Sequence, residues 1–194
     1  MKVAILKYNA GNVASVQNAL ERLGVETVVT DDVEVLRQAD KVIFPGVGEA
    51  STAMKYLRDR ELGEAITSLT QPVLGICLGM QLLCAHSEEN DTRCLGIFPN
   101  RVRQFANTKL KVPHTGWNTI SGFSSDLFAG IAEESYVYFV HGYYVETSEG
   151  SAAFCNYGRD FAAAIEWSNV YAVQFHPEKS GSVGARILEN FLKL

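Results

Sequence analysis

The segment from residue 72 to 81, PVLGICLGMQ, contains a cysteine whose neighbours suit it to act as a nucleophile. A short apolar run precedes Cys77, and Gly75 and Gly79 stand two residues before and two after it. This spacing is typical of a sharp turn from a strand into a helix, which exposes the residue at the turn and tolerates a strained backbone. A helix N-terminus behind the thiol also favours the reactive thiolate. A buried strand cysteine packed between glycines fits the same segment equally well.

A thiol nucleophile needs a base to take up its proton and a third group to orient that base. The segment QFHPEKSG offers His176 and Glu178 for these roles. Side chains two residues apart in an extended chain point to the same side, so both would project together where Pro177 ends the strand. Alone, this segment would be read as a loop histidine beside an unrelated surface carboxylate. Joined to Cys77, it predicts a triad of Cys77, His176 and Glu178.

The overall composition is that of an ordinary globular protein, with 194 residues and a formal charge of -5. We expect one sizeable core and a single domain over residues 1–194. The lack of a basic cluster argues against nucleic acid or an anionic membrane as the main partner, and no apolar run approaches a membrane span. Without a signal-peptide pattern we expect a cytoplasmic location with reduced cysteines. Cys84, His86 and Cys94 match no zinc spacing, so no metal is expected.

The first third of the chain alternates strand-like and helix-like segments, which predicts βαβ units and a mainly parallel sheet. Strands are expected over residues 3–7, 25–29 and 73–76. Helices are expected after the first strand and ending at Gly24, over a short stretch capped by Asp31 with Glu34, and over 49–69 with an interruption near Gly63. Beyond about residue 95, short β-rich runs predict an antiparallel extension, followed by a final amphipathic helix. The expected fold is therefore α/β, with helices flanking the sheet.

The segments GICLGMQLL and FHPEKSG together resemble the class I (triad) glutamine amidotransferases. The resemblance runs from the first strand to the last helix, with both motifs in the expected order. It implies a flavodoxin-like fold and an enzyme that attacks the side-chain amide of L-glutamine, releases ammonia and hydrolyses a glutamyl thioester without a cofactor. It also implies Gly48, Gln81 and Glu89 as substrate contacts. Without the resemblance, Glu89 would belong to a solvated acidic run.

Attack on an amide creates an oxyanion, which needs backbone N–H donors. Leu78, which follows Cys77, is expected to supply one donor, and Val47 in the loop PGVG is expected to supply the other. The glycines would let this loop approach the substrate or flip a peptide. A plain turn after a strand is the alternative interpretation of the Pro-Gly pair.

Within the family, the segments PGVG, PHTGWN, YFVHGY and HPEKSG are similar to the glutaminase subunits of imidazole glycerol phosphate synthases, which serve histidine biosynthesis. This resemblance implies a heterodimer in which the partner is a (β/α)8-barrel cyclase. The cyclase would use the ammonia on a phosphoribosyl intermediate, giving imidazole glycerol phosphate and an aminoimidazole carboxamide ribotide. A partner chain is also expected because this sequence has no phosphate-binding P-loop motif and no length left for a synthase domain.

The resemblance also implies that Trp117 and Lys179 lie at the interface with this partner, near the active site. A buried core aromatic is the alternative for Trp117. His114 and His141 are expected to be structural or interface residues, because the triad already has its base.

Four positions depart from the family pattern. Lys7 and Asn9 replace the usual acidic residue and glycine of the first loop, Gly142 replaces a serine, and Asn100 stands where a glycine is common. Asn tolerates a positive φ better than most residues. These changes leave the triad intact and bear on partner docking and on the glutamine carboxylate, which a main-chain N–H at position 142 or 143 could still bind.

Three other interpretations stay open at this point. The chain could be the glutaminase of another synthase, such as that of pyridoxal phosphate. It could be a flavodoxin-like binding module with an inert Cys77, although the intact His176 and Glu178 argue against this. It could also be a general thiol hydrolase or peptidase, which assays with glutamine and with generic esters would distinguish.

The first testable prediction concerns the nucleophile. Cys77→Ser should abolish glutamine hydrolysis and leave folding nearly intact, whereas serine at any of the other three cysteines should preserve activity. Steady-state ammonia release measures both effects. Labelling of a different cysteine by an electrophilic glutamine analogue would contradict the assignment.

Overall fold

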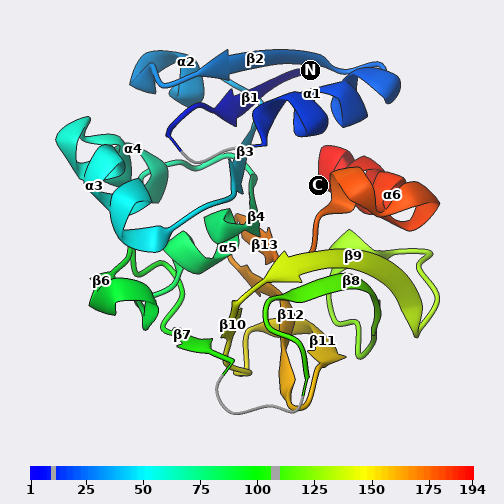
Figure 1. Cartoon of the computed structure of the whole chain (residues 1–194). Helices are drawn as coiled ribbons and strands as arrows, with labels where there is room; N and C mark the ends of the chain where they lie inside the picture. The colour runs from blue at the N-terminus through cyan, green and yellow to red at the C-terminus, as the bar shows by residue number, and fades with distance from the viewer. Residues whose placement is uncertain (10–11, 106–109) are drawn as a thin grey trace.

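A computed structural model describes residues 1–9, 12–105 and 110–194 of the chain. At its centre lies a seven-stranded sheet in the order β11-β12-β13-β4-β3-β1-β2 (Figure 1). The strands from β13 to β2 are parallel, whereas β11 and β12 form an antiparallel edge. The strands are β1 (Lys2–Leu6), β2 (Glu26–Thr30), β3 (Lys41–Gly46), β4 (Val73–Cys77), β11 (Ser151–Asn156), β12 (Asp160–Trp167) and β13 (Val170–Val173). The expected mainly parallel sheet with an antiparallel extension is confirmed.

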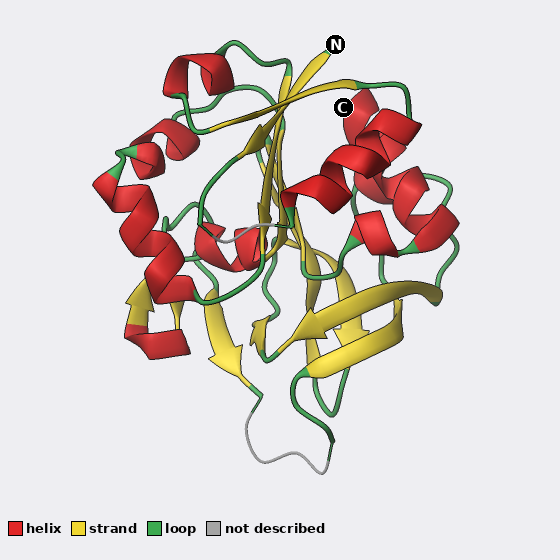
Figure 2. Ribbon diagram, turned by 45° about the horizontal axis from the view of Figure 1, so that its top comes forward, coloured by secondary structure: helices red, strands yellow, loops and turns green. Residues whose placement is uncertain are grey.

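Helices cover both faces of this sheet (Figure 2). Val3 and Ile5 of β1 share a buried cluster with residues of α1 and α6, whereas Ala4 and Leu6 share one with residues of α2 to α5. Successive side chains of a strand point to opposite faces, so an uninterrupted apolar strand needs a helix layer on each side. The helices are α1 (Val13–Arg22), α2 (Val33–Arg37), α3 (Ala50–Asp59), α4 (Leu62–Thr67), α5 (Leu78–Leu83) and α6 (Gly181–Lys193). None of these described helices has the length and apolar character needed to span a membrane.

Two smaller sheets accompany the central one. One has four short strands and the other is a long antiparallel ribbon of β8 with β9. The ribbon passes the carboxyl end of β4, because the carbonyl of Val140 in β9 lies 3.8 Å from the sulfur of Cys77. These strands are β5 (His86–Ser87), β6 (Thr92–Arg93), β7 (Arg101–Gln104), β8 (His114–Ile120), β9 (Ser135–His141) and β10 (Tyr143–Val145). Short 3-10 turns are η1 (Glu89–Asp91), η2 (Asp126–Phe128) and η3 (Pro177–Lys179).

The N-cap of α2 differs from the prediction by one residue. The carboxylate of Asp32, not that of Asp31, accepts hydrogen bonds from the N–H groups of Glu34 at 2.8 Å and Val35 at 3.3 Å. Asp31 instead forms an ion pair with Arg60 at 2.9 Å. Both aspartates precede the same apolar segment, and a sequence pattern alone does not decide which of two adjacent carboxylates caps it.

The long helical stretch is interrupted near Gly63, as predicted. Its interruption lies at Glu61, which adopts a left-handed conformation with φ of 57°, and Gly63 lies inside α4. Gly24 follows α1 with φ of 75° and donates its N–H to the carbonyl of Glu21, as expected for a helix C-terminus.

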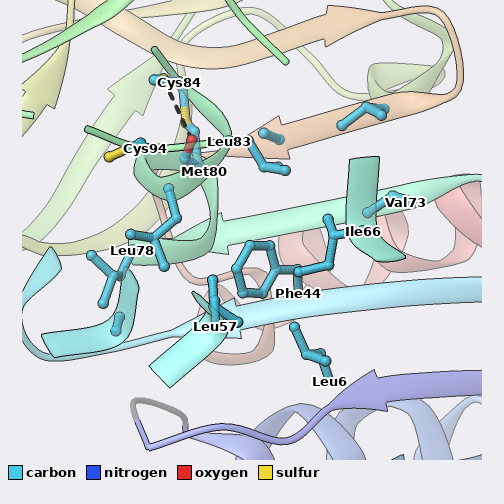
Figure 3. Packing of buried hydrophobic residues seen from close by; sticks show 14 of the residues in the cluster. Leu6, Phe44, Leu57, Ile66, Val73, Leu78, Met80, Leu83, Cys84 and Cys94 are labelled. Carbon is cyan, nitrogen blue, oxygen red and sulfur yellow. Dashed lines mark hydrogen bonds between the residues drawn. The ribbon is translucent and has the colours of Figure 1, made fainter. Parts of the chain in front are cut away.

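Helix α5 is buried on every side. All residues from Leu78 to Leu83 are buried, and the side chains of Leu78, Met80 and Leu83 lie in the same core as Phe44 (Figure 3). Apart from Gln81 its residues are apolar or glycine, and a buried helix of this kind is held by packing over its surface. The residue just before it, Cys77, is therefore fixed by packing on a rigid element.

Candidate active site

Cys77 occupies a strained turn between β4 and α5. Its backbone has φ of 54° and ψ of -109°, which is costly for a residue with a side chain. A Cβ atom at Gly75 would lie 2.6 Å from the Leu83 side chain, and one at Gly79 would collide with the carbonyl oxygen of Phe44. Only glycine fits at both positions, so the predicted reason for the flanking glycines agrees with the geometry.

His176 and Glu178 form a buried pair beside Cys77. Nδ1 of His176 donates to Oε1 of Glu178 at 2.8 Å, and both side chains are only 1% exposed. The side-chain amide of Asn12 also donates to Glu178 at 3.5 Å. Because the carboxylate fixes the proton on Nδ1, Nε2 is left free, and it has no hydrogen-bond partner among the described residues. Nε2 is therefore the nitrogen that exchanges a proton with a neighbouring group.

The local geometry of this pair differs from the extended chain that was predicted. His176 itself is extended, but Pro177 begins the 3-10 turn η3, which contains Glu178. The fixed φ of proline suits the first position of a helical turn. The two side chains therefore meet through a turn and not through strand alternation.

The charge state of His176 depends on its neighbours. Burial lowers its pKa, but its interactions with Cys77 and Glu178 outweigh that effect and raise the pKa from 6.5 to about 10. An imidazolium held between a carboxylate and a sulfur favours a thiolate partner. This electrostatic arrangement suits a thiol nucleophile with a general acid and base.

The other three cysteines are buried thiols away from such groups. Burial raises the pKa of Cys94 and Cys155 to about 12, and raises that of Cys84 well above its usual value. The thiol of Cys84 donates to the carbonyl of Met80 at 3.5 Å inside the core (Figure 3). These thiols pack as small apolar side chains and resist ionisation.

A cavity of about 220 Å³ opens over the Cys77 sulfur. The described residues that line it include five of the predicted site residues, which are Val47, Gly48, Cys77, Leu78 and Gln81. Leu78 is the first residue of α5, so its N–H has no partner within the helix. The cavity has a size and a polar rim that suit a small amino-acid side chain.

Glu89 lies next to this cavity rather than in its described lining. Its carboxylate accepts from the N–H of Ala50 at 2.7 Å, at the start of α3. Burial raises the pKa of Glu89, the Ala50 bond lowers it, and Glu49 raises it, with a net upward shift. The Glu89 carboxylate therefore already has one structural partner in this structure.

Two residues near Cys77 were not predicted from the sequence. The side-chain amide nitrogen of Gln174 lies 3.7 Å from the Cys77 sulfur, inside the core. Tyr8 packs its ring on Phe44 with centroids 5.4 Å apart, and its buried hydroxyl has no partner among the described residues. The signal for Gln174 was a single polar residue in the apolar run VYAVQF, which is unusual for a buried strand.

The comparisons with known proteins agree with this geometry. Residues 5–194 match the family model described as glutamine amidotransferase class-I. The chain belongs to the class-I glutamine amidotransferase family. It is 60% identical to the imidazole glycerol phosphate synthase subunit HisH of Bacteroides fragilis and 57% identical to that of Bacteroides thetaiotaomicron, in both cases over 100% of each chain.

Solved structures share the fold at low identity. A putative GMP synthase protein from Thermoplasma acidophilum matches with a TM-score of 0.78 and 21% identity, covering 100% of this chain and 92% of that one. PurLQS from Thermotoga maritima matches with a TM-score of 0.72 and 20% identity, covering 99% and 97%. The class-I glutamine amidotransferase fold expected from the sequence is confirmed.

The four departures from the family pattern have different structural settings. Lys7 is exposed, and the amide of Asn9 donates to the carbonyl of Thr52 at 3.4 Å; Ala10 and Gly11 of the same loop lie outside the described residues. Gly142 lines the cavity, and a Cβ atom there would meet only a methyl group of Val112 at 4.0 Å, so serine would also fit.

Asn100 is held by its side chain. It has no positive φ, and its buried amide donates to the carbonyl of Glu146 at 2.8 Å and to the hydroxyl of Ser148 at 2.9 Å. The expectation that asparagine stands here because it tolerates a positive φ is therefore wrong, and the hydrogen bonds of its side chain explain its presence.

His114 and His141 form a buried neutral pair in this class-I glutamine amidotransferase. Nδ1 of His141 donates to the carbonyl of Tyr143 at 2.7 Å, so its Nε2 accepts from Nδ1 of His114 at 2.9 Å. Burial lowers the pKa of His114 to about 4 and that of His141 to about 3. Both rings stay uncharged at neutral pH and pack among aromatic side chains.

Trp117 and Lys179 are both exposed. Trp117 is 55% exposed on β8, with its ring edge against Tyr138 at 5.9 Å between centroids, which excludes the buried-core alternative. Tyr136 on the same ribbon is 60% exposed. Lys179 follows Glu178 in η3 and is exposed.

The second testable prediction separates the base from the residue that orients it. His176→Ala should lower glutamine turnover by roughly 10⁴-fold or more, as losing one member of such a unit does. Glu178→Gln should cost at least about tenfold less, because Nδ1 keeps an acceptor without the charge. A greater loss for Glu178→Gln than for His176→Ala would reverse the proposed roles.

A matched control is Glu133→Gln. The Glu133 carboxylate accepts the backbone N–H of Gly122 at 2.8 Å, and neither residue belongs to the described lining of the cavity over Cys77. It should leave turnover within about twofold of the unmodified chain.

Proposed function

We propose that this chain is the glutaminase subunit of an imidazole glycerol phosphate synthase, acting as one domain in the cytoplasm. Its activity is the hydrolysis of L-glutamine to glutamate and ammonia. The observation that carries this proposal is the 60% identity over the full length of a relative with that name. The buried His176 and Glu178 pair beside a cysteine in a strained turn supports the chemistry.

The reaction begins at the Cys77 sulfur. The thiolate attacks the side-chain amide carbon of glutamine, forming a C–S bond and a tetrahedral oxyanion. His176 then donates its proton to the departing nitrogen, the C–N bond breaks, and ammonia leaves a glutamyl thioester. His176 next takes a proton from water, the water oxygen attacks the thioester, and glutamate is released with the thiolate restored.

The oxyanion and the substrate require further groups. We assign the oxyanion donors to the N–H groups of Leu78 and Val47 and the substrate contacts to Gly48, Gln81 and Glu89. The position of four of these five residues on the wall of the 220 Å³ cavity supports the assignment. Glu89 would pair with the α-ammonium of glutamine through the oxygen that Ala50 leaves free.

The ammonia needs a consumer, which we propose to be a (β/α)8-barrel cyclase subunit bound as a heterodimer. The exposed face of the β8 and β9 ribbon, with Trp117, Tyr136 and Tyr138, is the proposed docking surface, together with Lys179. Exposed aromatic residues are enriched at the centres of protein interfaces. Lys179 adjoins Glu178, so a partner bound there would lie next to the catalytic groups.

The third testable prediction is that glutamine hydrolysis depends on the partner. Pro45 and Gly46 end β3, and Val47 and Gly48 follow it. We propose that the peptide of Val47 withholds one oxyanion donor in the isolated chain, and the loss of such a donor costs about 10²- to 10³-fold in rate. Ammonia release should therefore rise by about a hundredfold or more from the isolated chain to the complex with acceptor nucleotide. Equal turnover in the isolated chain, the complex and the complex with acceptor would favour a free-standing glutaminase or thiol hydrolase.

The fourth testable prediction concerns the docking surface. Trp117→Ala should weaken binding of the cyclase by about tenfold or more, since truncating a central interface tryptophan is among the costliest changes. Trp167→Ala is the matched control. Trp167 is 64% exposed and pairs with Val170, at the opposite end of the sheet from Cys77. Titration calorimetry compares the two, and equal effects would contradict the proposed surface.

A further inference from the structure

Gln174 lies in the core between the proposed nucleophile and a residue of the cavity wall. It directly follows β13, and its side chain is fully buried. One end of its amide faces the Cys77 sulfur at 3.7 Å, and the other faces the amide of Gln81 at 2.9 Å. A buried amide with partners at both ends is a fixed polar group.

The orientation of both amides follows from one backbone carbonyl. The carbonyl of Tyr143 can only accept, so the Gln81 atom 3.1 Å away must be its amide nitrogen. The same nitrogen lies 2.9 Å from the Gln174 side chain, so the Gln174 atom facing it must be the oxygen. The amide nitrogen of Gln174 is then directed at the sulfur of Cys77.

Among the described groups near the sulfur, two hydrogen-bonding neighbours have opposite character. The carbonyl of Val140, at 3.8 Å, can accept from a thiol S–H but offers nothing to a thiolate. The N–H of Gln174 can donate to a thiolate, in a charge-assisted bond that is stronger than a neutral one. We propose that Gln174 is a catalytic residue that stabilises the Cys77 thiolate through its side-chain N–H, and that Gln81 holds it in this orientation.

This assignment rests on the proposed function of Cys77 as the nucleophile. The ionisable groups near the sulfur, among the described residues, include His176 and Tyr8, whose pKa values Cys77 perturbs. Glu178 lies behind His176, and His141 and Tyr143 line the same cavity as Cys77. Gln174 carries no charge at any pH, so its contribution is a constant one that favours the ionised sulfur. Its removal should therefore shift the ionisation of the thiol without adding a new titrating group.

The fifth testable prediction uses iodoacetamide, which alkylates thiolates and needs neither glutamine nor an oxyanion hole. Alkylation of Cys77 in the full chain is followed by peptide mass spectrometry from pH 5 to 10. In Gln174→Met, the pH of half-maximal alkylation should rise by roughly one unit, the size of a charge-assisted hydrogen bond. Turnover of glutamine in the cyclase complex should fall by about tenfold or more.

Two further variants separate this role from a structural one. Gln174→Glu keeps an oxygen for Gln81 but directs a second oxygen at the sulfur, so the alkylation profile should again move upward while KM for glutamine stays within about threefold. Asn190→Leu removes another buried amide, which donates to the carbonyls of Leu127 at 3.0 Å and Ala129 at 2.9 Å. It should lower the melting temperature and leave the alkylation profile unchanged.

The proposal is overturned if folded Gln174→Met or Gln174→Glu shows the profile of the unmodified chain, or if Asn190→Leu shifts it equally. A wrong assignment of the glutaminase function would give a different result from a wrong assignment of Gln174. In that case the unmodified chain hydrolyses no glutamine with its partner, while the alkylation profiles still report on the contact between Gln174 and Cys77.

Discussion

Cys77 and His176 meet because β4 and β13 are hydrogen-bonded neighbours in the central sheet. The register pairs Ile76 with Val173, so Cys77 at the end of β4 and residues 174–176 after β13 lie at the same edge of the sheet. Ligand sites of α/β proteins form at the carboxyl ends of parallel strands. A shift of one residue in this register would turn the side chains of one strand to the opposite face.

The polar groups of the site are supported by segments from across the chain. The Glu178 carboxylate accepts a hydrogen bond from the side-chain amide of Asn12, which precedes α1. The hydroxyl of Ser180 donates to the carbonyl of His176 at 2.6 Å. The same hydroxyl accepts the N–H of Tyr138 in β9 at 2.9 Å. Buried charges are tolerated only when they are paired, and His176 and Glu178 pair through Nδ1 and Oε1, while Nε2 of His176 and Oε2 of Glu178 have no partner among the described residues. The site is thus preorganised.

The sequence predicted the features that local rules control. Apolar periodicity predicted the parallel sheet, and the glycines around Cys77 predicted the sharp turn, because both depend on neighbours in sequence. The break near Gly63 was predicted, but the cap at Asp32 was missed by one residue, since helix boundaries are uncertain by a residue or two and either aspartate can serve there. The turn after His176 was missed because Pro177 is compatible with either the end of a strand or the start of a helical turn.

The role of Gln174 could not be predicted from the sequence pattern, for a different reason. Its partners are Cys77 and Gln81, which come from a distant strand and helix, so only the assembled sheet shows what its amide does. Glu89 presents the reverse case. Its family role was expected from sequence, and the structure adds a bond to Ala50 that no local pattern indicates.

The residues beside Cys77 are distant from it in sequence, and this separation determines when the site assembles during folding. Gln174 is separated from Cys77 by 97 residues, and β13 is the last strand of the sheet. Contacts between such distant segments form late, because the loop between them must be ordered first. During synthesis the cysteine leaves the ribosome long before its histidine exists. The nascent chain therefore carries a Cys77 thiol without its base. Glutamine hydrolysis by this thiol can begin only after β13 and the residues that follow it have folded against β4.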